Sequence, residues 1–194
     1  MKVLVETSAR HIHLSEDAIK VLFGDDYKLT PKKYLSQPEQ FACEEKLEIV
    51  GAKGSIKGVT VLGPPRNKTQ VEISLTDARK IGILTPVRES GDLYNTPGCD
   101  IIGPKGKYIL KEGVIVAKRH IHMPEFDAKE NSFKDGQIVC VKVDSEERSG
   151  IFGDVVIRVS DKFKLAMHVD TDESNAFGLD KKISTYGEII LKNW

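Results

Sequence analysis

Two copies of an Arg-His-Ile-His motif hold the side chains with the clearest chemistry in this sequence. His11 and His13 belong to the first copy and His120 and His122 to the second, at an offset of 120 − 11 = 109 residues. Each copy follows an apolar run rich in β-branched residues, which predicts a strand. Because residues i and i+2 of a strand point to the same face, both imidazoles of a pair are expected to point the same way.

A third candidate ligand lies in each half of the chain. A weaker repeat aligns residues 71–82 with residues 167–178, and it places Glu72 opposite His168, at an offset of 168 − 72 = 96. Together the two sets use all five histidines: His11, His13 and Glu72 in the first, and His120, His122 and His168 in the second. Three protein ligands leave a coordination position open, as in catalytic zinc sites. Imidazole and carboxylate ligands suit zinc and tolerate cobalt, nickel or manganese. A duplicated strand alone would explain the repeat, but not why the repeated residues are histidines. We therefore predict two zinc ions per chain.

Arg66 is the candidate residue for binding an anion. It lies in a proline-containing turn, residues 63–69, just before the strand predicted to carry Glu72. The separation of six residues would place both side chains on one face of an unbroken extended segment. A guanidinium beside a metal suits a phosphate group, whereas the alternative is an exposed loop arginine. Arg10 and Arg119 adjoin the histidine pairs and point to the opposite face, where surface or inter-subunit pairing is expected.

The elements that must position these residues are mostly short strands. Apolar runs between turn residues predict strands at residues 46–50, 55–62, 69–75, 137–143, 153–159 and 164–169. Ser15 is predicted to cap a helix that Gly24 ends, and further short helices are predicted at residues 76–81 and 172–177 and after Pro124. Residues 88–107 are rich in Gly, Pro, Asn and Asp and predict a long loop. The pattern is typical of a mainly β fold of small barrels capped by short helices.

Composition excludes several partners. Lys plus Arg and Asp plus Glu both total 29, so the zero net charge gives no reason to expect nucleic acid or an anionic membrane. No apolar stretch approaches the roughly 20 residues of a membrane span. Cys43, Cys99 and Cys140 are far apart and odd in number, which favours reduced thiols in a cytoplasmic protein.

Several motifs together resemble one family. Ser-Ala-Arg-His-Ile-His-Leu-Ser, Gly-Pro-Pro-Arg-Asn-Lys-Thr-Gln-Val-Glu, Arg-Glu-Ser-Gly, Ile-Ile-Gly-Pro-Lys-Gly and Ala-Lys-Arg-His-Ile-His-Met are similar to motifs of the PduL-type phosphotransacylases, or phosphate propanoyltransferases. The resemblance covers nearly the whole chain. It implies two small β-barrels with a two-zinc site between them and the ligand sets given above. Arg66 would then match the arginine that contacts phosphate.

The resemblance also implies a domain organisation and a reaction. The first barrel would span residues 10–117, and the second, residues 118–194, would be completed by the N-terminal strand, residues 1–9. The predicted enzyme interconverts acyl-CoA (propanoyl-CoA or acetyl-CoA) and phosphate with acyl-phosphate and CoA, by direct zinc-assisted transfer. The alternatives are a two-zinc hydrolase of phosphoesters or thioesters, and a non-catalytic zinc-binding barrel protein.

The family resemblance leads to two further expectations. Its members form dimers or larger assemblies with CoA bound near the subunit interface, so a homodimer is expected. Members that enter bacterial microcompartments usually carry an amphipathic N-terminal extension, whereas here five residues precede Glu6. This favours a free cytoplasmic enzyme unless such a segment has been removed, and the microcompartment lumen is the alternative location.

Overall fold

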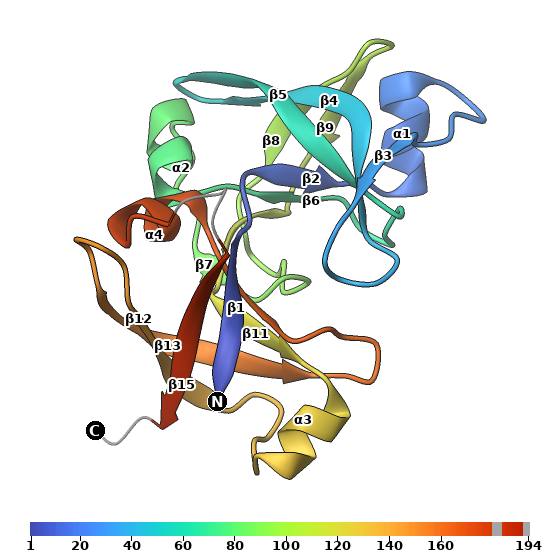
Figure 1. Ribbon diagram of the computed structural model, residues 1–194. Coiled ribbons are helices and arrows are strands. Elements are labelled where there is room, and N and C mark those ends of the chain that lie inside the picture. Colours follow the sequence, from blue (N-terminus) through green and yellow to red (C-terminus); the bar gives the residue numbers. More distant parts are fainter. Residues whose placement is uncertain (180–183, 192–194) are drawn as a thin grey trace. The chain divides into compact units, whose positions relative to one another are not determined.

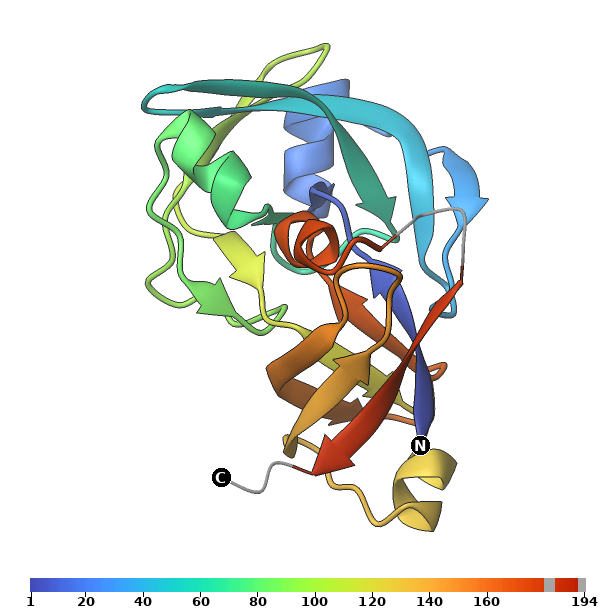
Figure 2. The same cartoon turned by 60° about the vertical axis from the view of Figure 1, so that its left-hand side comes forward.

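The computed structural model describes residues 1–179 and 184–191, which fall into two compact units (Figure 1, Figure 2). The barrel unit comprises Met1–Ser8, Ser36–Pro38 and the chain from Lys118 onward. The sheet unit comprises Ala9–Leu35 and Glu39–Ala117. Each unit has a hydrophobic core of its own. The barrel unit therefore combines segments that are far apart in the sequence, whereas the sheet unit is nearly continuous.

The barrel unit is built on a closed barrel with the strand order β1-β14-β11-β13-β12-β15 (Figure 1). Its strands are Lys2–Thr7 (β1), His120–Met123 (β11), Ile138–Val143 (β12), Gly150–Val159 (β13), Ala166–Val169 (β14) and Thr185–Leu191 (β15). Alternate residues of β12, Val139, Val141 and Val143, are fully buried in the core because successive side chains of a strand point to opposite faces.

The sheet unit holds a nine-stranded sheet in the order β7-β10-β6-β2-β5-β4-β8-β9, with β3 paired to β4. Its strands are His11–His13 (β2), Pro31–Tyr34 (β3), Phe41–Gly51 (β4), Gly54–Gly63 (β5), Gln70–Glu72 (β6), Val87–Arg88 (β7), Cys99–Ile102 (β8), Lys107–Leu110 (β9) and Val114–Ala117 (β10). This sheet curls but is not closed (Figure 1). The predicted fold class, mainly β with barrel-like units and short helices, is confirmed.

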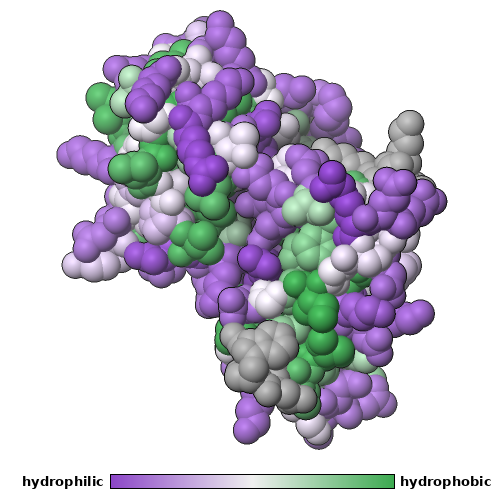
Figure 3. Space-filling view, turned by 90° about the vertical axis from the view of Figure 1, so that its left-hand side faces the viewer, coloured by the Kyte–Doolittle hydropathy of each residue, from purple (hydrophilic) through white to green (hydrophobic). Residues whose placement is uncertain are grey.

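Four short helices accompany the strands in the described residues: Glu16–Phe23 (α1), Leu75–Ile81 (α2), Glu125–Glu130 (α3) and Thr171–Ala176 (α4). Ser15 caps α1 by accepting a hydrogen bond from the Ala18 N–H, and Gly24 ends that helix, as predicted. None of these helices is long and apolar enough to span a membrane. Figure 3 shows one face of the molecule, where hydrophilic side chains predominate and apolar side chains form smaller patches.

Strand pairing reveals an exchange between the two halves of the repeat. Strand β1 precedes the first histidine pair but pairs in parallel with β14, with Glu6 opposite His168. Strand β10 precedes the second pair but pairs in parallel with β6, with Ile115 opposite Glu72. Glu6 and Ile115 are related by the same offset as the histidines, 115 − 6 = 109. Each repeat therefore contributes its leading strand to the unit that holds the other repeat's histidine pair.

Two local predictions were wrong. The segment predicted as a long loop, residues 88–107, contains β8, which pairs with β4 and β9. This strand is only four residues long, and because Gly and Pro residues flank it, the composition of the whole segment predicted a loop. The strand predicted at residues 69–75 ends at Glu72, because Ser74 caps α2 by accepting from the Asp77 N–H.

Candidate metal centres

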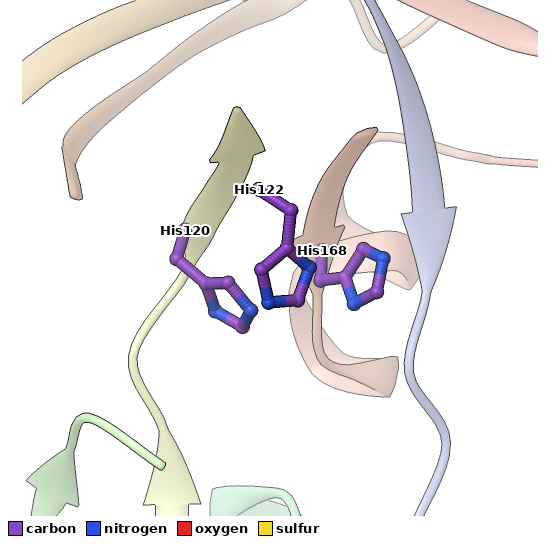
Figure 4. A group of neighbouring side chains, drawn as sticks. All are labelled: His120, His122 and His168. Atoms are coloured by element: carbon purple, nitrogen blue, oxygen red, sulfur yellow. The ribbon is translucent and has the colours of Figure 1, made fainter. Parts of the chain in front are cut away.

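All six predicted ligands gather into two groups, one in each unit. In the sheet unit, one ligand atom from each of His11, His13 and Glu72 lies within 4.8 Å of the others. In the barrel unit the same holds for His120, His122 and His168 (Figure 4). The ligand sets expected from the two repeats are therefore brought together in space.

The same strand register builds both groups. Strand β2 runs antiparallel to β6 with His11 opposite Glu72, and β11 runs antiparallel to β14 with His120 opposite His168. Each of these histidine strands also pairs in parallel with a long strand, β5 or β13. The weaker repeat, with its offset of 96, thus corresponds to a shared structural position.

The distances in the first group resemble those of a metal site. Nε2 of His11 lies 3.4 Å from Oε2 of Glu72, and Nε2 of His13 lies 3.9 Å from Oε1. Two ligands that are each about 2.0–2.1 Å from a tetrahedral zinc lie about 3.3–3.4 Å apart. The three side chains are almost fully buried. Little movement is needed for them to share one ion.

Backbone carbonyls fix the orientation of the first histidine in each pair. Nδ1 of His11 lies 2.8 Å from the Ala9 carbonyl oxygen, and Nδ1 of His120 lies 2.8 Å from that of Lys118. A carbonyl only accepts, so in both rings Nδ1 carries the proton and Nε2 is left to bind a metal. A hydrogen bond of this kind from the second ring nitrogen accompanies most histidine ligands.

Electrostatics prepares the first group for a cation. Burial would raise the pKa of Glu72, but the adjacent His11 and His13 and a hydrogen bond from Ser90 lower it far below its usual range. Burial, the charge of His11 and the charge of Arg66 hold the pKa of His13 well below its usual value. Burial would also lower the pKa of His11, but Glu72 outweighs it and raises that pKa. An ionised Glu72 and a neutral His13 are the forms that bind metal, whereas a metal would have to displace the extra proton that Glu72 favours on His11.

Polar side chains also bind the carboxylate of Glu72. Its Oε1 accepts hydrogen bonds from the Gln70 amide and, at 2.9 Å, from the Ser90 hydroxyl. Ser90 Oγ in turn accepts from Gln70 Nε2 at 2.9 Å and from Arg66 Nη1 at 3.2 Å. The Gly91 N–H donates to Gln70 Oε1 at 2.8 Å. Ser90 thus connects the predicted anion-binding arginine to the predicted metal ligand.

The second group consists of three histidine rings packed around one another. Ring centroids lie 4.6 Å apart for His120 and His122, 5.4 Å for His120 and His168, and 4.8 Å for His122 and His168 (Figure 4). Phe163 covers His122 at 4.3 Å. Both groups therefore fit a zinc ion in donor chemistry and spacing, and three ligands apiece leave room for a substrate oxygen.

Comparison with known proteins identifies the family of this chain. A family model described as phosphate propanoyltransferase matches residues 4–180. The chain belongs to the phosphate propanoyltransferase family. Curated relatives of that name include proteins from Sebaldella termitidis (52% identical, covering 97% of this chain and 88% of the relative), Thermotoga maritima (55%, 90% and 83%) and Listeria monocytogenes (50%, 98% and 88%). The predicted resemblance and the assignment of the chain as an acyltransferase are confirmed.

One prediction about Arg66 was wrong, whereas the pairing expected of Arg10 and Arg119 is present. Residues 64–69 do not continue β6, so the expected alternation between Arg66 and Glu72 along one extended segment is wrong. Arg66 reaches the Glu72 network through Ser90 instead. The pairing expected for the arginine beside each histidine pair is present, with a helix carboxylate of the same unit: Arg10 binds Asp77 at 2.7 Å, and Arg119 binds Glu173 at 2.8 Å.

Three residues near the ligands were missed as functional candidates. Gln70 lies two residues before Glu72, and this i, i+2 spacing along a strand was an available signal. Ser90 belongs to the Arg-Glu-Ser-Gly motif of the phosphate propanoyltransferase resemblance, but the motif alone does not show what it contacts. Glu6 is charged where the other repeat has the buried Ile115, and this difference between the two copies could have identified Glu6 as a functional candidate.

Proposed function

We propose that this chain transfers a propanoyl or acetyl group reversibly between CoA and phosphate, with two zinc ions as cofactors. One ion would be held by His11, His13 and Glu72, and the other by His120, His122 and His168. The observation that carries the proposal is the gathering of six donor side chains into two three-ligand groups in a chain of the phosphate propanoyltransferase family. The names of the relatives support propanoyl-CoA, and acetyl-CoA differs from it by one methylene.

The reaction needs an oriented phosphate and a stabilised carbonyl oxygen. A phosphate oxygen attacks the thioester carbonyl carbon, the C–S bond breaks, and the proton of hydrogen phosphate passes to the CoA thiolate. The products are acyl-phosphate and CoA. Bound zinc would supply a Lewis acid that neutralises phosphate and polarises the carbonyl. Thiolate is a good leaving group, so a strong general acid is not required.

Arg66 is the residue that we propose for phosphate. Its charge acts on both His11 and His13, which supports a place beside the first ligand group. The hydrogen bond from its Nη1 to Ser90 restricts the guanidinium plane. A planar guanidinium held in this way can donate paired hydrogen bonds to phosphate oxygens, so that it positions the nucleophile.

The cysteines support direct transfer without an acyl-enzyme. Cys43, Cys99 and Cys140 are free thiols and all are buried. Burial, together with the nearby Glu45 and Asp100 carboxylates respectively, raises the pKa of Cys43 and Cys99 to about 12. Because the thiolate is the nucleophile, neither side chain is suited to accept an acyl group at neutral pH.

The experiment that tests this function is the release of CoA thiol from propanoyl-CoA and acetyl-CoA, with and without phosphate, before and after chelation. Release that requires phosphate and stops on chelation, with recovery on adding zinc, supports the proposal and ranks the two acyl groups. Release without phosphate would identify a hydrolase instead. No release from a zinc-loaded chain would favour a binding protein.

We also propose that the enzyme is a homodimer that works in the cytoplasm or in a microcompartment lumen. The support is the family resemblance, together with large apolar side chains left exposed in the sheet unit, such as Leu84 and Tyr94. Light scattering coupled to size-exclusion chromatography measures the mass directly. A monomer at the concentrations used for the activity assay would refute the dimer.

A further inference from the structure

A carboxylate from the first strand lies against the three-histidine group. Oε2 of Glu6 is 3.1 Å from Nε2 of His168, and strand pairing sets the two residues side by side. Figure 4 shows His168 between His122 and strand β1. An ionised carboxylate only accepts hydrogen bonds, so the geometry requires the proton of His168 to be on Nε2. Nδ1 is then the ring nitrogen left with a lone pair.

Glu6 is itself held in place. The Ser36 hydroxyl donates a short hydrogen bond to the same Oε2. Ser36 belongs to Ser36–Pro38, the short segment that joins the barrel unit. The amide of the adjacent Gln37, which is buried, donates to the Lys164 carbonyl at 2.9 Å and accepts from the Lys164 N–H at 3.2 Å. This double hydrogen bond anchors the segment just ahead of the strand that carries His168.

Comparing the two repeats shows how the Glu6–His168 contact differs from its counterpart in the sheet unit. The position of Glu6 is occupied in the other copy by Ile115, which is fully buried beside Glu72. The sheet unit thus has a carboxylate among its ligands and an apolar side chain next to them. The barrel unit has only neutral ligands and a carboxylate next to them. Each group therefore has one negative charge to offset a divalent cation, although by different means.

We propose that Glu6 is a positioning residue for His168. It holds the ring in the Nε2–H tautomer, so that His168 presents Nδ1 to the second metal, and it supplies the negative charge that the three-histidine group lacks. The inference rests on the proposed zinc function for its metal part, but its tautomer part applies to the metal-free chain as well.

The first test is therefore made without metal. Long-range ¹H–¹⁵N correlation spectra of the metal-free chain at about pH 8, above the ordinary imidazole pKa of about 6.5, report which nitrogen of His168 is protonated. We expect the Nε2–H tautomer in the parent chain and in Glu6→Gln, whose amide oxygen still accepts, and a mixture in Glu6→Ala. A protonated Nδ1 in the parent chain, or an unchanged tautomer in Glu6→Ala, overturns the proposal.

The second test measures zinc binding at one group. In the full chain carrying His13→Ala, which disables the first group, competition with a chromophoric chelator gives the affinity of the second. Adding Glu6→Ala to this chain is expected to weaken the zinc affinity of the second group about 10- to 100-fold. Adding Glu6→Gln is expected to weaken it less. Glu188→Gln is the matched control, because it removes one carboxylate from an exposed position of β15 in the same barrel. Circular dichroism verifies folding of each variant.

The outcomes distinguish the positioning role of Glu6 from the proposed zinc function of the chain. Equal zinc affinity with and without Glu6 refutes the positioning role. Coordination through Nε2 of His168 in the zinc-loaded chain also refutes it, because the proposed hydrogen bond to Glu6 needs the proton on that nitrogen. A parent chain that binds no zinc refutes the proposed function, while the tautomer spectra still decide the role of Glu6.

Discussion

Replacing Ser90 by Ala tests whether one hydroxyl couples the anion-binding arginine to the first metal group. Ser90 Oγ donates to Glu72 at 2.9 Å and accepts from Gln70 and Arg66 at 2.9 and 3.2 Å, so it uses its one proton and both lone pairs. Alanine removes all three contacts with little change in volume. It leaves Glu72 with one fewer donor in a buried site.

The magnitude follows from the kind of hydrogen bond that is lost. A hydrogen bond to a charged group contributes about 1.5–3 kcal/mol, and the Ser90–Glu72 bond is of this kind. The Arg66 contact is longer and half-exposed, so we assign it little additional free energy. If the metal-bound state carries the whole loss of about 2 kcal/mol, zinc affinity at the first group falls about 30-fold, which is the upper bound of the effect. The three-histidine group belongs to the barrel unit and is expected to keep its affinity.

Two assays check this expectation. Chelator competition gives the zinc affinities of the two groups, and the phosphate dependence of CoA release gives the KM for phosphate. In Ser90→Ala the zinc affinity of the first group should fall and the KM for phosphate should rise. Ser90→Thr keeps the hydroxyl, so both quantities should lie closer to their values in the parent chain. Unchanged zinc affinity and unchanged phosphate KM in Ser90→Ala would refute the coupling. Equal losses in the alanine and threonine variants would assign the effect to loop packing.

The remaining predictions concern metal content, thiols and stability. His122→Ala is expected to bind one zinc ion per chain where the parent binds two, as measured by elemental analysis after dialysis; two retained ions would contradict its place as a ligand. At pH 8 iodoacetamide should label Cys43 and Cys99 far more slowly in the folded than in the unfolded chain, since pKa values of about 12 leave almost no thiolate; equal rates would disprove this. Arg119→Met should lower the free energy of unfolding by about 1–2 kcal/mol, because it loses the Glu173 ion pair and the contact with the Phe152 ring; an unchanged urea midpoint would show that both contacts are negligible.

The candidate ligands of each site could be predicted from the chain alone. The Arg-His-Ile-His copies are local motifs, and strand periodicity is a property of consecutive residues, so the pairing of His11 with His13 and of His120 with His122 followed directly. The third ligands required a fainter repeat, but a repeat is again a sequence property. The cap at Ser15 was predictable for the same reason, since a helix terminus is satisfied by residues a few positions away.

What the tertiary structure alone decided is which distant residues support these ligands. Glu6 reaches His168 across 162 residues because β1 joins the barrel unit, and Ser90 reaches Glu72 and Arg66 because the loop after β7 folds back onto them. Strand partners are chosen by the burial of apolar faces and the pairing of backbone groups over the whole chain, which no local pattern specifies. Residue type and spacing thus determined the predicted ligands, including Glu72, whereas the strand exchange decided that Glu6 lies beside the three-histidine group.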